Sequence, residues 1–147
     1  MKAKTKTRKT APRGEFSGVF RELRAILEPM GSELVINQDT PSAYYVDTPG
    51  VVIRGKPVFF ALVRLGKNYV SYHLMPVYAS PDLQKQISPA LRTRMPGKSC
   101  FNFTHSDPAA FSELARLTRA GLERFTDPSF WRKMEEMERA RKQRGRR

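Results

Sequence analysis

The stretch that decides the fold runs from residue 33 to residue 75: ELVINQDTPSAYYVDTPGVVIRGKPVFFALVRLGKNYVSYHLM. Five short segments in it are rich in β-branched and aromatic residues: ELVIN, AYYVD, GVVIR, PVFFALVRL and NYVSYHLM. The turn sequences DTPS, DTPG, RGKP and LGKN separate them. Connections this short join strands as hairpins, so the pattern predicts an antiparallel sheet. The segment PVFFALVRL is apolar on both faces and is expected near its centre.

A helical pattern precedes these strands. Apolar residues recur at spacings of three and four between residues 15 and 30, which predicts an amphipathic helix that ends at Pro29. Its inward face would consist of Phe16, Val19, Phe20, Leu23, Ile26, Leu27 and Met30.

Further helices are expected after the strands. Pro81 and Pro89 each open a short helix, and SCFNF (residues 99–103) reads as one more strand. Asp107 is placed to cap a longer helix that begins at Pro108, and Asp127 with Pro128 repeats this opening for a last helix. The longer helix has an apolar stripe of Phe111, Leu114, Ala115, Thr118, Leu122 and Phe125. The whole order predicts a two-layer α+β fold, in which helices cover a curved antiparallel sheet of about five to six strands.

The positive charge is concentrated at the two ends of the chain. The 147 residues carry a formal net charge of +13. Residues 1–13 hold six basic residues and no acid, and residues 132–147 have a net charge of +5, which leaves +2 for residues 14–131. We therefore expect a disordered basic tail (1–13), a single domain (14–131) and a basic extension that is helical or disordered (132–147).

The composition also bounds the class of protein. No apolar run approaches the length of a membrane-spanning helix, and no apolar segment follows the basic N-terminus as in a secretory signal. Cys100 is the single cysteine, so an internal disulfide is impossible. These features predict a protein of the cytoplasm with no membrane partner.

Three segments together resemble a known family. They are NQDTPSAYYVDT (37–48), KNYVSYHLMPVY (67–78) and RMPGKSCFNF (94–103), preceded by FRELRAILE and followed by FSELARLTRAGLERF. In order and spacing they are similar to the YdhG-like family, small bacterial proteins with a domain of unknown function. The resemblance covers roughly residues 16–125, and Pro96 stands where family members tend to have a polar residue. It implies a curved antiparallel sheet packed by helices and no enzymatic activity, although some members are described as frataxin-like iron chaperones.

Two predicted strands carry polar side chains on one face each. In NYVSYHLM the apolar residues Val70, Tyr72 and Leu74 alternate with a second set. That set is Tyr69, Ser71, His73 and Met75. In SCFNF the polar face consists of Cys100 and Asn102, and the opposite face of Phe101 and Phe103.

If these strands share one face of the sheet, they predict a site for a small polar or anionic ligand with a cation at its rim. The candidate ligand-binding residues are Tyr69, Ser71, His73, Arg94, Lys98, Cys100 and Asn102. The alternative is that these side chains form only the solvated face of the sheet.

Catalytic and metal chemistry have little basis in the sequence. Cys100 and His73 could form a nucleophile and base with Asn102 as the orienting group, but no local motif supports this. A structural zinc needs four ligands, whereas the chain offers Cys100, His73 and His105. Iron prefers clustered carboxylates, and arginines interrupt the glutamates of the first helix. RLGK and MPGK lack the spacing of a phosphate-binding loop. We expect no enzyme activity, no cofactor and no metal.

Three functions remain in order of preference. The first is a non-enzymatic module that binds a small ligand or a segment of a partner protein through the predicted site. The second is a frataxin-like iron-binding chaperone, which follows from the family resemblance alone. The third is a nucleic-acid-associated protein that binds weakly and without sequence specificity through its basic tails.

Overall fold

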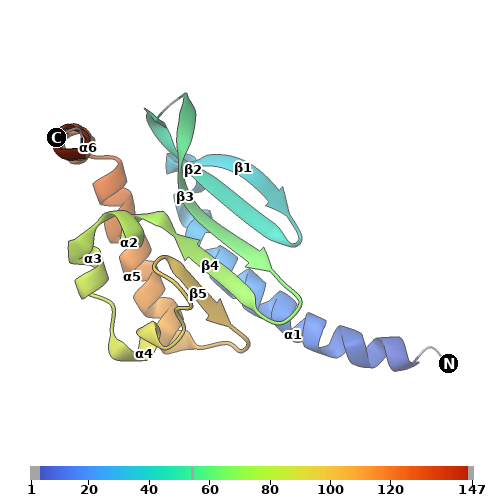
Figure 1. Cartoon of the computed structure of the whole chain (residues 1–147). Coiled ribbons are helices and arrows are strands. Elements are labelled where there is room, and N and C mark those ends of the chain that lie inside the picture. Colours follow the sequence, from blue (N-terminus) through green and yellow to red (C-terminus); the bar gives the residue numbers. More distant parts are fainter. Residues whose placement is uncertain (1–3, 54, 146–147) are drawn as a thin grey trace.

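The computed structural model describes residues 4–53 and 55–145 and shows an open five-stranded sheet (Figure 1). The strands are β1 (Val35–Thr40), β2 (Ala43–Ile53), β3 (Lys56–Leu65), β4 (Val70–Leu74) and β5 (Cys100–Phe103). They lie in the order β1-β2-β3-β4-β5, and every neighbouring pair is antiparallel. The predicted α+β class is confirmed, and PVFFALVRL forms the central strand β3.

The helices are placed on one side of this sheet. They are α1 (Lys4–Leu27), the 3-10 helix η1 (Glu28–Glu33), α2 (Met75–Ala79), α3 (Pro81–Lys85), α4 (Pro89–Arg92), α5 (Pro108–Phe125) and α6 (Pro128–Gly145). Figure 1 shows α1 and α5 behind the sheet, whose other face no described helix covers. No helix in the described part of the chain is long and apolar enough to cross a membrane.

The N-terminal helix is longer than the sequence pattern predicts. It ends at Leu27, just before Pro29, as expected, but it begins at Lys4. Residues 4–13, for which disorder was predicted, thus continue the helical backbone, and residues 1–3 lie outside the described residues. Lysine, arginine and alanine, which make up six of these ten residues, favour the helix intrinsically, whereas the three threonines and Pro12 do not.

The segment GVVIR is not a separate strand. AYYVD and GVVIR both belong to β2, which pairs with β3 before the DTPG sequence (Asp47 with Phe59) and after it (Val52 with Pro57). Gly50 has a φ of 71°, a conformation that glycine adopts without strain. The proline and glycine therefore produce an irregularity within one long strand rather than a chain reversal.

Another correction concerns the end of β4. The sequence pattern predicts Met75 as the last residue of the strand, but it begins α2, whose first turn contains Pro76. Proline fits the first turn of a helix because its missing N–H needs no partner there. α2 packs closely on α5: a Cβ atom added to Gly121 would lie 2.7 Å from Cβ of Pro76.

The hydrophobic core lies between the covered face of the sheet and the helices. Tyr72, Leu74 and Phe101 are fully buried, as are Leu23 of α1 and Phe125 of α5. Of the seven residues predicted to form the inward face of the first helix, six are buried and Ile26 is partly buried. Burial at this scale supplies the main favourable term in folding.

The two last helices start as the sequence predicts. The carboxylate of Asp107 accepts a hydrogen bond from the backbone N–H of Ala110 and so caps α5. In α6 the side chains of Phe130 and Trp131 pack against Phe125, and the indole N–H of Trp131 donates to the carbonyl of Phe125 at 2.7 Å. None of the residues of α6 is fully buried, and Figure 1 shows this helix end-on at the edge of the molecule.

Candidate functional site

The two faces of β4 differ in the way that its alternating sequence predicts. Val70, Tyr72 and Leu74 are completely buried against the helices. Ser71 and His73 point to the opposite side, where no helix of residues 4–53 and 55–145 covers the sheet. On β5 the same division places Phe101 and Phe103 in the core and leaves Cys100 and Asn102 partly exposed.

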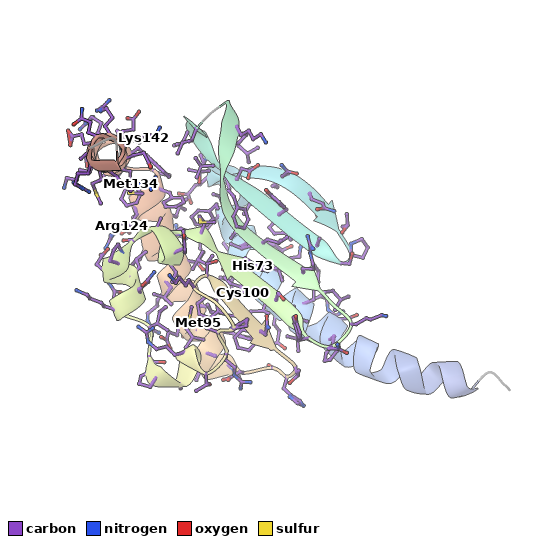
Figure 2. All side chains as sticks on the ribbon, viewed as in Figure 1. His73, Met95, Cys100, Arg124, Met134 and Lys142 are labelled. Carbon is purple, nitrogen blue, oxygen red and sulfur yellow. The ribbon has the colours of Figure 1, made fainter. Side chains whose placement is uncertain are left out.

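The register between β4 and β5 brings four polar side chains together. Ser71 lies opposite Asn102, and His73 lies opposite Cys100, so their side chains are neighbours on one face. We call Ser71, His73, Cys100 and Asn102 the polar cluster. Figure 2 shows His73 and Cys100 on adjacent strands. The predicted sharing of one sheet face by these four residues is present in the structure.

Hydrogen bonds connect the members of the polar cluster. The Ser71 hydroxyl donates to Oδ1 of Asn102 at 3.1 Å, and the Cys100 thiol donates to the same oxygen at 3.4 Å. Sγ of Cys100 also lies 3.6 Å from Nε2 of His73. The bonds from Ser71 and Cys100 both end on Oδ1 of Asn102. The amide nitrogen of Asn102 donates to no partner in the described part of the chain, so both of its N–H groups remain available.

Arg64 of β3 adds a positive charge beside this cluster. It lies opposite Ser71 in the β3–β4 register, so both side chains belong to the same face. Among residues 4–53 and 55–145, no carboxylate lies within ion-pair distance of its guanidinium. We call Arg64 and the polar cluster together the open face. Arg64 is not among the residues predicted for the site, although a single charge inside the apolar run PVFFALVRL marks the solvent side of a strand.

The electrostatics of the open face favour the neutral forms of His73 and Cys100. Partial burial, and then the positive charge of Arg64, lower the pKa of His73 below its usual 6.5. Burial raises the pKa of the Cys100 thiol, an effect that the hydrogen bond with Ser71 offsets only in part. A thiolate nucleophile needs the opposite shift of the cysteine pKa. The contact between Cys100 and His73 is therefore that of a neutral thiol with a neutral imidazole.

Three of the predicted site residues do not join the polar cluster. Tyr69 precedes β4, is 42% exposed, and uses its backbone carbonyl to close the turn with the N–H of Gly66. Arg94 points toward the helix side, where it pairs with Asp107 at 3.1 Å and its guanidinium lies over the ring of Phe103. The carboxylate that caps α5 thus draws Arg94 away from the open face.

Lys98 is the third of these residues. It is exposed, and it lines a cavity next to α3 and α4 rather than the open face. The predicted arrangement, a cationic rim around the polar side chains of β4 and β5, is therefore wrong for Arg94 and Lys98. On the open face the neighbouring cation is Arg64.

The described residues offer no group of three or more His, Cys, Asp or Glu side chains that could hold a metal ion. His105 is hydrogen-bonded to the hydroxyl of its neighbour Thr104 at 2.9 Å. Of the first-helix glutamates, Glu22 accepts a hydrogen bond from Ser106, and Glu28 pairs with Arg24. These carboxylates are thus separately engaged rather than clustered.

Comparison with family models, curated proteins and solved structures gives no match to this chain. The resemblance of residues 16–125 to the YdhG-like family stays a prediction.

Proposed function

We propose that this protein is a non-enzymatic binding module and that its open face receives a partner rich in hydrogen-bond acceptors. The observation that carries this proposal is the set of unused donors on an uncovered sheet: the amide N–H groups of Asn102 and the guanidinium of Arg64. Carboxylates and carbonyl groups are the partners that such donors prefer. A polar or anionic ligand, or an acidic segment of a protein, has this chemistry.

The internal hydrogen bonds of the polar cluster favour binding over catalysis. Ser71 and Cys100 both donate to Asn102, which fixes the orientation of its amide. A preorganised donor loses less conformational entropy when a partner binds. The neutral states of Cys100 and His73 give no support to nucleophilic catalysis. A reducing location such as the cytoplasm suits the free thiol of Cys100.

A thermal-shift screen of the full chain with succinate and short glutamate-rich peptides tests this proposal. A ligand at a hundred times its dissociation constant stabilises the native state by about 2.7 kcal/mol, which raises the melting temperature by several degrees. We expect this shift to disappear in Asn102→Ala and in Arg64→Gln. Lys67→Gln removes an exposed charge from the neighbouring turn and should keep the shift. An equal response of all four proteins would refute binding at the open face.

A second candidate is nucleic-acid binding through the chain ends, and the exposed helix α6 favours it. The charged residues in its last two turns are all basic: Arg139, Arg141, Lys142 and Arg144. Such a helix would bind phosphates without sequence specificity. We expect affinity for a short single-stranded oligonucleotide to fall steeply with salt and to be lost when the chain is shortened after residue 131. Affinity that survives this truncation would exclude α6 as the binding element.

The iron-chaperone alternative has no comparable support from the geometry. It predicts stoichiometric binding of ferrous ion that is lost when Glu22 and Glu28 are changed to glutamine. The separate engagement of these two carboxylates, with Ser106 and with Arg24, gives no reason to prefer it.

A further inference from the structure

A cavity of about 300 Å³ lies between the two short helices α3 and α4 and the turn that leads into β5. Its lining residues are Gln84, Ile87, Arg92, Met95, Gly97 and Lys98. Figure 2 shows Met95 in this part of the molecule. None of the lining residues belongs to the open face, so the cavity is a separate feature. One water occupies about 30 Å³ in the liquid, so the cavity has room for a molecule of about ten heavy atoms.

Two cations without ion pairs line this cavity. Arg92 lies at the end of α4 and Lys98 lies in the following turn. Within the part of the chain that the structure describes, neither has a carboxylate within ion-pair distance. The guanidinium of Arg92 donates one hydrogen bond, from Nη2 to the carbonyl of Gln84. This bond holds one edge of the guanidinium and leaves its other N–H groups for a ligand.

The carboxylates on the adjoining helices do not neutralise these cations. Asp82 of α3 accepts hydrogen bonds from Ser80 and Arg124. Glu113 of α5 accepts from the backbone N–H and the hydroxyl of Ser88, at 2.8 and 2.7 Å. Neither carboxylate lines the cavity. The lining therefore has two positive charges and no negative one.

The rest of the cavity lining consists of two apolar side chains on one side and of the backbone of Gly97 on another. Ile87 is 4% exposed, and Met95 is a partly buried side chain packed against the core. Gly97 contributes backbone alone, and a Cβ atom added there would meet no atom within 4 Å. Its φ lies outside the range that favours glycine, so a larger residue can replace it without backbone strain.

We propose that this cavity binds a small organic anion, with a carboxylate or phosphate between Arg92 and Lys98 and a compact apolar body against Ile87 and Met95. Ligand pockets of this kind combine an apolar wall with a few polar groups that fix orientation. Arginine holds such anions through paired hydrogen bonds, and lysine contributes a point charge.

Calorimetric titration of the full chain with benzoate and with phenyl phosphate tests this site, with benzamide as the neutral control. We expect saturable binding of at least one of the two anions and none of benzamide. Arg92→Gln and Lys98→Gln should each weaken binding about tenfold, since a hydrogen bond to a charged group is worth about 1.5 kcal/mol. The double variant Arg92→Gln/Lys98→Gln removes both charges and should abolish binding. A preference for either anion identifies the head group.

Two matched variants locate the effect. Lys85→Gln removes an exposed cation from α3 that does not line the cavity, and it should bind as the parent does. Asn102→Ala disables the open face and should also bind normally, so failure here is distinguishable from failure of the proposed function. The proposal is overturned if neither anion binds saturably. It is equally overturned if the double variant Arg92→Gln/Lys98→Gln, folded and with an unchanged melting temperature, binds as well as the parent.

Discussion

The two faces of the sheet differ in the burial and the polarity of their side chains. On the covered face, side chains of β4 and β5 such as Tyr72 and Phe101 are fully buried and in contact with helices. On the open face, at the positions adjacent to these two in each strand, Ser71 and Asn102 are hydrogen-bonded to each other; Asn102 is partly exposed, and Ser71 is 9% exposed. The period of two residues in a strand separates these roles without any change in backbone.

This difference teaches where a variant should cost stability and where it should cost binding. Large apolar side chains stabilise the native state through the area that they remove from water. Polar side chains that remain hydrated contribute little to the free energy of folding, because their hydrogen bonds in the native state replace hydrogen bonds to water in the unfolded chain. Substitutions on the two faces can therefore test the division directly.

The largest expected effect comes from the pair Phe101→Ala and Asn102→Ala, adjacent residues on opposite faces. Loss of the buried ring should lower the free energy of unfolding by about 3–5 kcal/mol, because a cavity remains in the core. Loss of the Asn102 side chain should cost about 1 kcal/mol or less. Urea denaturation of the two variants beside the parent measures both values. Equal losses would contradict the division between the faces.

A smaller effect is expected for the buried hydrogen bond between Tyr72 and Thr118 on the covered face. The hydroxyl of Thr118 donates to the carbonyl of Leu114 at 2.7 Å, so Tyr72 must be the donor in its 2.6 Å bond with Thr118. Tyr72→Phe leaves no donor unpaired and should cost about 1 kcal/mol. A double-mutant cycle with Thr118→Val isolates the pairwise energy. Full additivity of the two losses would show that the hydrogen bond does not stabilise the fold.

The sequence predicts the covered face better than the open face, for a physical reason. Buried apolar residues recur at regular spacings in the sequence. Spacing alone therefore predicts which side chains face the core between Phe16 and Met30 and between Val70 and Leu74. Which strands pair, and in which register, depends on contacts between distant segments. The alternating patterns of residues 69–75 and 99–103 define two polar sets. They do not place Ser71 opposite Asn102, as the observed register does.

The other differences between the predicted and the observed structure also arise from contacts between segments that are distant in the sequence. Proline and glycine at 49 and 50 favour a turn locally, but β3 is long enough to pair with β2 on both sides of them. The direction of Arg94 depends on Asp107, a partner thirteen positions away that the local pattern does not specify. The cavity between α3, α4 and the turn before β5 requires the positions of all three segments, so no linear motif could predict it.

The smallest expected effect is a pH dependence that originates on the open face. The pKa of His73 lies below 6.5 in the folded protein because burial and Arg64 disfavour the imidazolium. Between that lowered value and the ordinary pKa, the unfolded chain binds more protons than the native state, so stability rises with pH. Acidification from about pH 7 through this window should therefore lower the melting temperature, with no further contribution below the folded pKa.

His73→Gln should remove this contribution, and Arg64→Gln should reduce it because one of its two causes is gone. His105→Gln provides the matched control, since it removes the other histidine of the chain and leaves His73 in place. Melting temperatures of the four proteins between about pH 5 and pH 8 measure the effect. If the parent and His73→Gln lose stability in parallel on acidification, the imidazole is not held neutral by its place on the sheet. The open face would then be as well hydrated as any exposed strand.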